Sequence, residues 1–307
     1  MWTGIKLIPD NTNIDFIGGR MFAFFVTFVM IAGSIVLLFT HGLNFGIDFT
    51  GGTLIEIETK QTPDLAKMRE DLNTLKLGEI SLQEFGNANT LLIRLPSQGE
   101  DPEVQKASIQ KVKDTIAKDY AEVDYRRVEF VGPQVGKELK QKGLMAVVFS
   151  ILGIMAYVWF RFEWQFGLAA VVSLIHDVVA TLGFMAITGK TFDLSTLAAV
   201  LMVAGFSIND TVVIFDRIRE IMRKYRKKPL DEVCNIAINE TLSRTVMTST
   251  VTILALISLW VFGGEVIQGF VDALLFGFCV GTYSSIYVAA AILLYTNLRA
   301  APEKADS

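Results

Sequence analysis

Six segments of this 307-residue chain are long and apolar enough to cross a hydrocarbon layer. Such a layer is roughly 30 Å thick and a helix rises about 1.5 Å per residue, so a span needs about 20 apolar residues. The segments are approximately Met21–Phe39, Gly143–Phe160, Gln165–Thr188, Leu194–Phe215, Val246–Phe262 and Val266–Tyr295. A soluble protein with several buried core helices is the alternative, but six such segments and a hydrophobic fraction of 51% disfavour it. We therefore predict an α-helical membrane protein with six transmembrane helices.

A cleaved signal peptide is an alternative interpretation of the first segment alone. The twenty residues before it are mixed and polar, and no cleavage site built of small residues follows Phe39. A signal peptide has a short positive region before its apolar core and such a site after it. We therefore expect a retained first helix.

Lysine and arginine in the short loops predict the orientation, because loops on the cytoplasmic side carry an excess of both. The segment from Arg217 to Lys228 holds seven basic residues against the single acid Glu220, whereas the loop between the third and fourth segments offers only Lys190. Four residues beyond the outermost segments agree with this: Lys6, Arg20, Arg299 and Lys304. Lys137, Lys140 and Lys142 point the other way, but they end a loop that is too long for the rule. Both termini are expected in the cytoplasm.

The expected order of domains follows from these spans. It is a cytoplasmic N-terminus (1–20), transmembrane helix 1 (21–39), an outer domain (40–142), transmembrane helices 2–6 (143–295) with a basic cytoplasmic loop at 217–240, and a cytoplasmic C-terminus (296–307).

The outer domain has the pattern of a small α/β fold. Alternation typical of strands occurs in Thr53–Glu58, Ile80–Phe85, Thr90–Leu95 and Val123–Phe130, the last with a bulge at Arg126-Arg127. Apolar residues share one helical face in two sets: Leu65, Met68, Leu72 and Leu75 after the N-cap Asp64, and Ile109, Val112, Ile116 and Tyr120 after Pro102. Gly86 to Asn89 read as the turn of a hairpin. The order βαββαβ predicts a ferredoxin-like domain.

Nothing in the sequence has the arrangement of an enzyme site. Cys234 and Cys279 lie in different settings and cannot share a disulfide, and neither has metal-ligand spacing to a histidine. His41 stands alone, and no glycine-rich nucleotide-binding loop opens a helix. We therefore expect no enzymatic activity, no metal, no cofactor and no nucleic-acid partner.

The residue that most constrains function is Asp210, which lies inside an apolar segment. An unpaired carboxylate inside a bilayer costs roughly 2.5 kcal/mol or more, so it usually lies on an ion pathway or beside a buried partner. Arg244, 34 residues further on, opens the next apolar segment and is the candidate partner. The pair suggests a proton or ion relay in which Asn209 orients the carboxylate by hydrogen bonding.

Other polar residues in the spans have two interpretations each. A stripe follows Arg244 on one helical face: Thr245, Thr248, Ser249 and Thr252. Its hydroxyls either bond to their own backbone or, with Thr248 and Thr252 foremost, line a hydrated cleft. The pair His176-Asp177 makes either an interhelical hydrogen bond or a relay. Asp272 is expected to be a structural or vestibule residue. Small residues recur every fourth position in the last segment, which predicts close helix packing: Ala273, Gly277, Gly281, Ser285 and Ala289.

Four motifs together resemble the SecF family, the accessory subunits of the bacterial protein translocase. They are Gly46-Ile-Asp-Phe-Thr-Gly-Gly52, the run from Gly205 to Glu220 that contains Ser207-Ile-Asn-Asp-Thr211, Ser243-Arg-Thr-Val-Met-Thr-Ser249, and Gly281-Thr-Tyr-Ser-Ser285. The first motif is shared with the sister subunit SecD, but Ser-Ile-Asn-Asp-Thr points to SecF. The resemblance covers essentially the whole chain.

The resemblance implies a six-helix half-transporter of the RND superfamily in the bacterial inner membrane. Such a subunit pairs with SecD as a heterodimer, docks on the SecYEG channel, often with YajC and YidC, and uses the proton-motive force, or sodium in some relatives, to pull the emerging preprotein outward. Its outer domain is then periplasmic, and the ATP-driven motor SecA works on the opposite face. Asp210 and Arg244 correspond to the ion-coupling residues. A structural assembly subunit without ion coupling and a half-size RND-type exporter are the alternatives.

Overall fold

The computed structural model describes residues 9, 12–99, 101–120, 122–296 and 298. The chain divides into two compact units. The membrane unit contains the described residues of 1–43, 147–190 and 195–307, and the sheet unit contains those of 44–146 and 191–194. Lys6, Arg299 and Lys304, which entered the prediction of orientation, lie outside the described residues.

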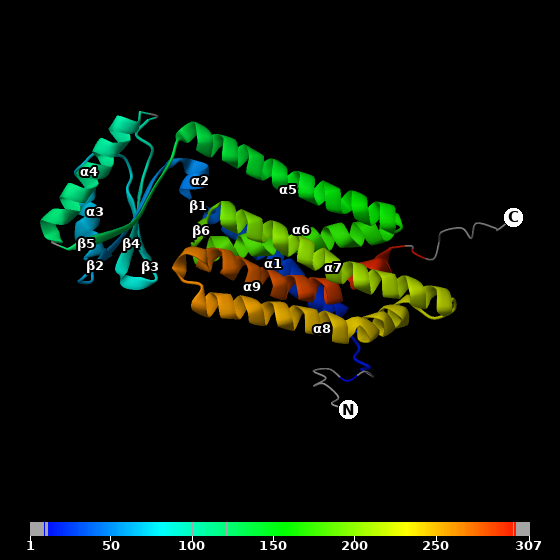
Figure 1. The fold of residues 1–307 in the computed structure, drawn as a ribbon. Helices are drawn as coiled ribbons and strands as arrows, with labels where there is room; N and C mark the ends of the chain where they lie inside the picture. Colours follow the sequence, from blue (N-terminus) through cyan, green and yellow to red (C-terminus); the bar gives the residue numbers. More distant parts are fainter. Residues whose placement is uncertain (1–8, 10–11, 100, 121, 297, 299–307) are drawn as a thin grey trace, which may run out of the picture. The chain divides into compact units, whose positions relative to one another are not determined.

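The described residues contain six helical segments that are long and apolar enough to span a membrane, which confirms the predicted number (Figure 1). Five are single helices: α1 (Arg20–Thr40), α5 (Pro133–Arg161), α6 (Trp164–Thr188), α7 (Leu194–Lys224) and α8 (Leu230–Phe262). The sixth runs from Glu265 to Tyr295 through a 3-10 turn (Glu265–Ile267), α9 (Gln268–Ser284), a π-helical turn (Ser285–Ala289), α10 (Ala290–Ile292) and a 3-10 turn (Leu293–Tyr295).

Three helices are longer than hydropathy predicted. The helix α5 begins ten residues before Gly143, α7 ends nine residues after Phe215, and α8 begins sixteen residues before Val246. Hydropathy finds only the apolar stretch of a helix, and backbone hydrogen bonding continues through polar turns at its ends. These extensions are rich in charged residues.

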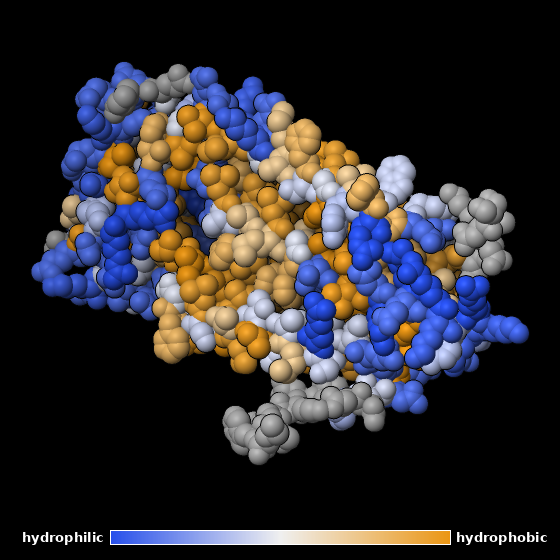
Figure 2. Space-filling view, turned by 45° about the vertical axis from the view of Figure 1, so that its right-hand side comes forward, coloured by the Kyte–Doolittle hydropathy of each residue, from blue (hydrophilic) through white to orange (hydrophobic). Residues whose placement is uncertain are grey.

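The helices differ in how much apolar surface they bury. In α6, α7 and the last span, at least half of the apolar stretch is buried, whereas in α1, α5 and α8 less than a fifth is. Figure 2 accordingly shows a continuous hydrophobic surface over the membrane helices, bounded by hydrophilic residues at the end that carries the α7–α8 turn. Exposed apolar side chains on outer helices are typical of proteins whose solvent is hydrocarbon.

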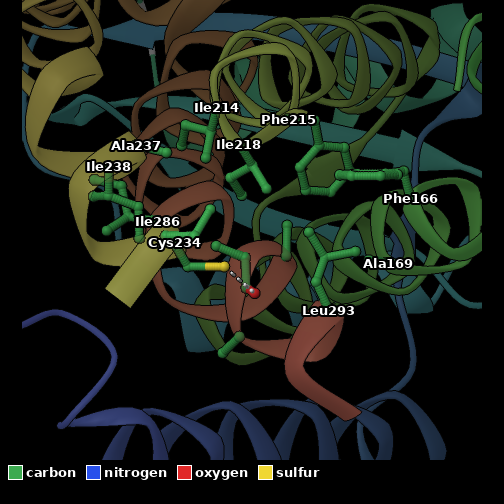
Figure 3. Packing of buried hydrophobic residues seen from close by; sticks show 14 of the residues in the cluster. Phe166, Ala169, Ile214, Phe215, Ile218, Cys234, Ala237, Ile238, Ile286 and Leu293 are labelled. Atoms are coloured by element: carbon green, nitrogen blue, oxygen red, sulfur yellow. Dashed lines mark hydrogen bonds between the residues drawn. The ribbon is translucent and has the colours of Figure 1, made fainter. Parts of the chain in front are cut away.

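The largest hydrophobic cluster of the membrane unit lies where α6, α7, α8 and the last span meet (Figure 3). Phe166 of α6 and Phe215 of α7 pack edge to face with ring centroids 5.1 Å apart, and both are fully buried. On the other side of the cluster, the Cys234 thiol of α8 lies 3.9 Å from the Ala290 carbonyl oxygen. The cluster holds one end of the four helices together.

The segment before α1 is anchored to α8 by two asparagines. Asn239 accepts a hydrogen bond from the Ile14 N–H (2.9 Å) and donates one to the Ile14 carbonyl (2.8 Å). Asn235 accepts from the Ile17 N–H (3.0 Å) and donates to Asp15 (2.7 Å). Phe16 and Ile17 are buried in the hydrophobic cluster. We call residues 12–19 with their two asparagine partners the N-terminal latch.

The sheet unit has the predicted ferredoxin-like fold. Its elements are β2 (Gly52–Thr59), α3 (Leu65–Asn73), β3 (Ser81–Phe85), β4 (Asn87–Leu95), α4 (Pro102–Asp119) and β5 (Val123–Val131). The strands form one antiparallel sheet in the order β3-β4-β2-β5. Both helices pack on one face of it, where Leu72, Val112 and Ile116 are buried among strand residues (Figure 1).

Details of the sheet unit confirm most of the sequence predictions. Asp64 caps α3 by accepting hydrogen bonds from two backbone N–H groups. The bulge in β5 lies at Arg126, because Glu56 pairs with Arg127 and the next residue pairs with Tyr125. The hairpin turn is shorter than the predicted turn from Gly86 to Asn89. Asn87 already pairs with Phe85, so only Gly86, with a φ of 69°, makes the turn.

The glycine-rich motif after α1 forms a compact turn that the sequence did not predict. It contains the short helix α2 (Ile47–Thr50), and it directly follows β1 (Asn44–Phe45), which pairs in parallel with β6 (Thr191–Phe192). Gly52 has a φ of 114°, and a Cβ there would lie 2.3 Å from the Leu95 carbonyl oxygen. Only glycine fits this position. Asp48 accepts a hydrogen bond from the Leu194 N–H (3.0 Å), the first residue of α7.

A half-buried arginine connects this turn to the sheet. Arg94 of β4 donates hydrogen bonds to Asn44 (2.9 Å) and Thr191. Burial lowers the pKa of its guanidinium, and the nearby Asp193 carboxylate partly offsets that shift. The arginine thus ties β1 and β6 to the central part of the sheet.

Candidate functional site

Asp210 lies near the middle of α7 and faces the interior of the helix bundle. Its side chain is 3% exposed. Among the described residues the oxygen Oδ2 has no hydrogen-bond partner. A buried carboxylate that lacks partners is costly in its charged form, because it has lost water without gaining donors. Asp210 is therefore a group whose protonation depends strongly on what approaches it.

Arg244 of α8 is a charged group that acts on Asp210. The two side chains interact electrostatically, but among the described residues no ion pair joins them. Arg244 is exposed on the helix surface. Ser249, one and a half turns further along α8, faces the carboxylate, yet its 2.9 Å hydrogen bond is made with Thr282 of α9. The acid and the base are neighbours without direct contact.

The two threonines predicted to support the site bond to their own helix. Thr248 donates to the carbonyl oxygens of Arg244 (3.0 Å) and Thr245 (2.9 Å), and Thr252 donates to that of Thr248 (2.8 Å). Each hydroxyl oxygen keeps lone pairs that can accept a hydrogen bond from water. The Asn209 side chain is exposed, and among the described residues it makes no hydrogen bond to Asp210.

Asp177 of α6 has the opposite surroundings. It is fully buried and accepts hydrogen bonds from three side chains. They are Ser284 (2.8 Å to Oδ2), Ser207, which also contacts Oδ2, and His176, whose Nδ1 lies 2.8 Å from Oδ1. Of the two interpretations of this pair, the structure shows interhelical hydrogen bonds. We call Asp177, His176, Ser207 and Ser284 the Asp177 cage.

A π-helical turn lies next to the cage. Ser285, the first residue of this turn, donates to the Ser207 carbonyl (3.2 Å), and its hydroxyl lies 2.9 Å from that of Thr211. Short π-helical turns inside α-helices occur often at functional sites. Sequence reasoning did not connect these serines with Asp177. The sequence does contain one signal for these serines, because each is a hydroxyl residue inside an otherwise apolar segment.

Close packing brings α7 and α9 together beside the cage. A Cβ added at Gly277 would lie 2.2 Å from a methyl group of Val203, and one at Gly281 would lie 3.1 Å from Ser207 Cβ. Ala273, Ser285 and Ala289 are fully buried. The small-residue stripe predicted for the last span is therefore confirmed as a packing surface.

Asp272 belongs to a different cluster, at the other end of α9. It forms an ion pair with Lys190 and accepts a hydrogen bond from the Trp260 indole (2.9 Å). These contacts join the ends of α6, α8 and α9. Asp272 has the surroundings of a structural residue.

The part of the chain that the structure describes shows no candidate metal site and no disulfide. No three His, Cys, Asp or Glu side chains there are grouped to hold an ion. Cys234 and Cys279 are both free cysteines.

Comparison with known proteins identifies the family. Residues 111–299 match the family described as "Protein export membrane protein SecD/SecF, C-terminal", and residues 36–63 match the "SecD/SecF GG Motif". The chain is 46% identical to the protein translocase subunit SecF of Rickettsia bellii over 290 residues, which cover 94% of this chain and 95% of that protein. It is 44% identical to SecF of Cereibacter sphaeroides, over 99% of this chain and 95% of the relative.

A solved structure of similar fold is that of SecDF from Thermus thermophilus, described as a translocon-associated membrane protein. It superposes with a TM-score of 0.85 at 33% identity over 94% of this chain. SecDF in a super-membrane-facing form gives a TM-score of 0.68. In both comparisons the chain spans 39% of the length of the SecDF chain. The relatives from Rickettsia bellii and Cereibacter sphaeroides are both named as protein translocase subunits. The chain belongs to the SecF family of protein translocase subunits.

Proposed function

We propose that this protein couples ion movement to preprotein export as the SecF half of a SecD–SecF unit. In this proposal the proton-motive force drives export on the periplasmic side, and Asp210 accepts and releases the proton. The observation that carries the proposal is a buried carboxylate in the middle of a membrane helix, with Arg244 nearby. Its Oδ2 atom has no hydrogen-bond partner among the residues that the structure describes.

The chemistry of the pair supports reversible protonation. Burial disfavours a charged carboxylate, whereas a nearby guanidinium favours it. Because Asp210 and Arg244 interact without forming an ion pair, a small movement of α7 relative to α8 changes the balance between these two effects. Arg244 stays charged throughout, since its guanidinium is not deprotonated in proteins. Protonation and helix position are thereby coupled.

Four further polar residues have supporting roles in this proposal. Thr248 and Thr252 accept hydrogen bonds from water on the helix surface and carry it toward the carboxylate, and Asn209 orients the carboxylate when the helices move. The Asp177 cage holds α6, α7 and α9 in register, so that the movement is confined to the side of α7 that faces α8.

The proposed partners follow from the family. SecD would supply the second half of the unit, in agreement with the 39% share of the SecDF chain that this chain covers. The SecYEG channel, YajC, YidC and the translocating preprotein are the further partners. The location is the bacterial inner membrane with both termini in the cytoplasm, which the basic residues near the α7–α8 turn support.

The test is gradient-driven translocation in inner-membrane vesicles that contain wild type or Asp210→Asn. Asp210→Asn removes the titrating group and keeps its size, so we expect the response to the proton gradient to be lost while the SecA- and ATP-driven component persists. Asp231→Asn is the matched control. It makes the same chemical change at an exposed aspartate in the first turn of α8, more than three turns before Arg244. Stimulation by the gradient that persists in Asp210→Asn would refute the assignment.

Two further measurements separate coupling from a purely structural role. Retained complex assembly in Asp210→Asn supports coupling, whereas lost assembly supports a structural subunit. The Arg244→Lys variant should show only part of the wild-type gradient response, because an ammonium group lacks the planar set of donors of a guanidinium. A full response in that variant contradicts a specific role for Arg244.

A further inference from the structure

A cavity lies where the last turns of α7 meet the end of α5. Six side chains line it: Arg161, Asp216, Arg219, Glu220, Arg223 and Lys224. The residues from α7 recur at helical spacing and so share one face, while Arg161 closes the cavity from α5. Four of the six side chains are cationic. None of them takes part in the coupling proposed for Asp210.

Both acids of the cavity are already engaged. Asp216 accepts hydrogen bonds from the Arg161 guanidinium at 2.8 and 3.0 Å. Glu220 is paired with Arg217, which does not line the cavity. In the described part of the chain Arg219, Arg223 and Lys224 make no ion pair with any acid. The cavity therefore has an excess of positive charge with donors available to an anion.

One of these cations is held in place before any ligand arrives. Arg219 donates a hydrogen bond to the Arg161 carbonyl oxygen (3.3 Å), and its guanidinium lies 5.3 Å from the centre of the Phe162 ring. Contact with an aromatic face restrains a guanidinium while leaving its edge donors free. Such preorganisation lowers the entropy lost on binding.

The neighbourhood of the cavity is that of a membrane interface. Arg161 directly follows the apolar stretch of α5, whose last residues Trp159 and Phe160 are 67% and 96% exposed. Trp164, at the start of α6, is 59% exposed. Exposed tryptophans at the end of an apolar helix are typical of the headgroup level of a bilayer. Figure 2 shows the hydrophobic surface meeting hydrophilic residues at this end of the helices.

We propose that this cavity binds the phosphate group of an anionic membrane phospholipid, with the acyl chains along the exposed apolar surface of α5. Basic pockets at the ends of transmembrane helices recognise anionic headgroups, and arginine binds phosphate oxygens through paired donors. A free phosphate would use the same donors but would gain nothing from the adjacent apolar surface. That surface is the reason for assigning a lipid.

The test measures lipid binding to the purified full-length protein in mild detergent by native mass spectrometry. The headgroup of dioleoylphosphatidylglycerol has a net negative charge, whereas the choline cation neutralises the phosphate of dioleoylphosphatidylcholine. We therefore expect wild type to retain the former preferentially. Arg223→Gln should weaken phosphatidylglycerol binding about fivefold, the loss expected for one basic residue at an anionic headgroup. The variant should leave phosphatidylcholine binding unchanged.

Lys227→Gln is the matched control, because Lys227 is an exposed cation near the same helix end that does not line the cavity. Equal weakening by both variants, or equal retention of the two lipids by wild type, overturns the proposal. Displacement of phosphatidylglycerol by an equal concentration of inorganic phosphate also overturns it. Arg223 lies in the last turn of α7, where cations complement the helix dipole, so circular dichroism is used to confirm that the variant is folded.

Discussion

The membrane unit contains two buried aspartates that differ sharply in their surroundings. Asp177 accepts hydrogen bonds from three side chains on its own and two other helices. Asp210 has an oxygen without a hydrogen-bond partner in the described part of the chain, and it interacts with Arg244 without forming an ion pair. Both side chains are at most 3% exposed. Depth in the bundle therefore does not distinguish them, whereas the number of donors does.

The difference shows how one residue type serves two purposes in one bundle. A carboxylate with all its donors in place stabilises one arrangement of helices, because any movement breaks several hydrogen bonds at once. A carboxylate without such donors does not strongly stabilise any one arrangement of helices, and it can bind and release a proton. We therefore regard the Asp177 cage as the fixed side of α7 and Asp210 as its variable side.

The largest expected effect is that of Asp177→Ala on stability. The change leaves His176, Ser207 and Ser284 without their shared acceptor in a region that water does not reach, and each unpaired buried group costs about 1–3 kcal/mol. Because the serine hydroxyls can bond to their own backbone instead, we expect a total loss of about 2–4 kcal/mol. Thermal unfolding of the purified protein in detergent measures it. Equal destabilisation by Asp210→Ala would contradict the comparison.

Gly281→Leu should disturb the cage without changing any polar group. A Cβ at this position already lies 3.1 Å from Ser207 Cβ, so a larger side chain pushes α9 away from α7. Overpacking of this kind costs about 1–3 kcal/mol. The control is Gly153→Leu on α5, where a Cβ meets nothing within 4 Å. The same unfolding measurement applies, and indistinguishable melting of the two variants would show that the contact carries no stability.

Asp210→Asn should alter stability by less than about 0.5 kcal/mol, even though it abolishes the gradient response. A neutral amide costs less to bury than a carboxylate, and no hydrogen bond to Oδ2 is lost. Unfolding and translocation measured on one preparation test both statements. A large loss of stability in this variant would place Asp210 with Asp177 as a structural residue.

Ser249→Ala should have only a small effect on stability and, unlike Asp210→Asn, it leaves the titrating group in place. It removes the 2.9 Å hydrogen bond to Thr282, but the Thr282 hydroxyl still donates to the Phe278 carbonyl (2.8 Å). Interhelical hydrogen bonds of this kind contribute about 0.6 kcal/mol in membrane proteins. Ser258→Ala on the same helix is the control, because its hydroxyl bonds only to the backbone of its own helix. Equal melting temperatures in the two variants would show that the α8–α9 hydrogen bond is neutral.

Sequence reasoning predicts the parts of this fold that depend on local patterns. The six spans follow from apolar length, and the sheet unit follows from alternation in strands and the faces of two helices. The cap at Asp64 and the bulge at Arg126 also depend on neighbouring residues alone. Each of these features is specified within one element or between two adjacent ones.

The Asp177 cage could not be predicted, because it depends on how three helices are rotated. Ser207 and Ser284 lie 30 and 107 residues from Asp177, and the π-helical turn after Ser284 sets which side chains face inward. The pairing of β1 with β6 likewise joins two short strands of two residues each, too short to show alternation. Asp210 was found because a charge inside an apolar segment is visible without knowing its neighbours.

The N-terminal latch has a consequence for biosynthesis. Asp15 and Asn235 are 220 residues apart, and ribosomes add about 5–20 residues per second, so the partner of the first segment is made about 10–40 s after it. During that interval Phe16 and Ile17 lack the cluster that buries them. The beginning of the chain can dock only after α8 has been synthesised, so a closed latch marks a nascent chain whose fifth membrane helix has arrived.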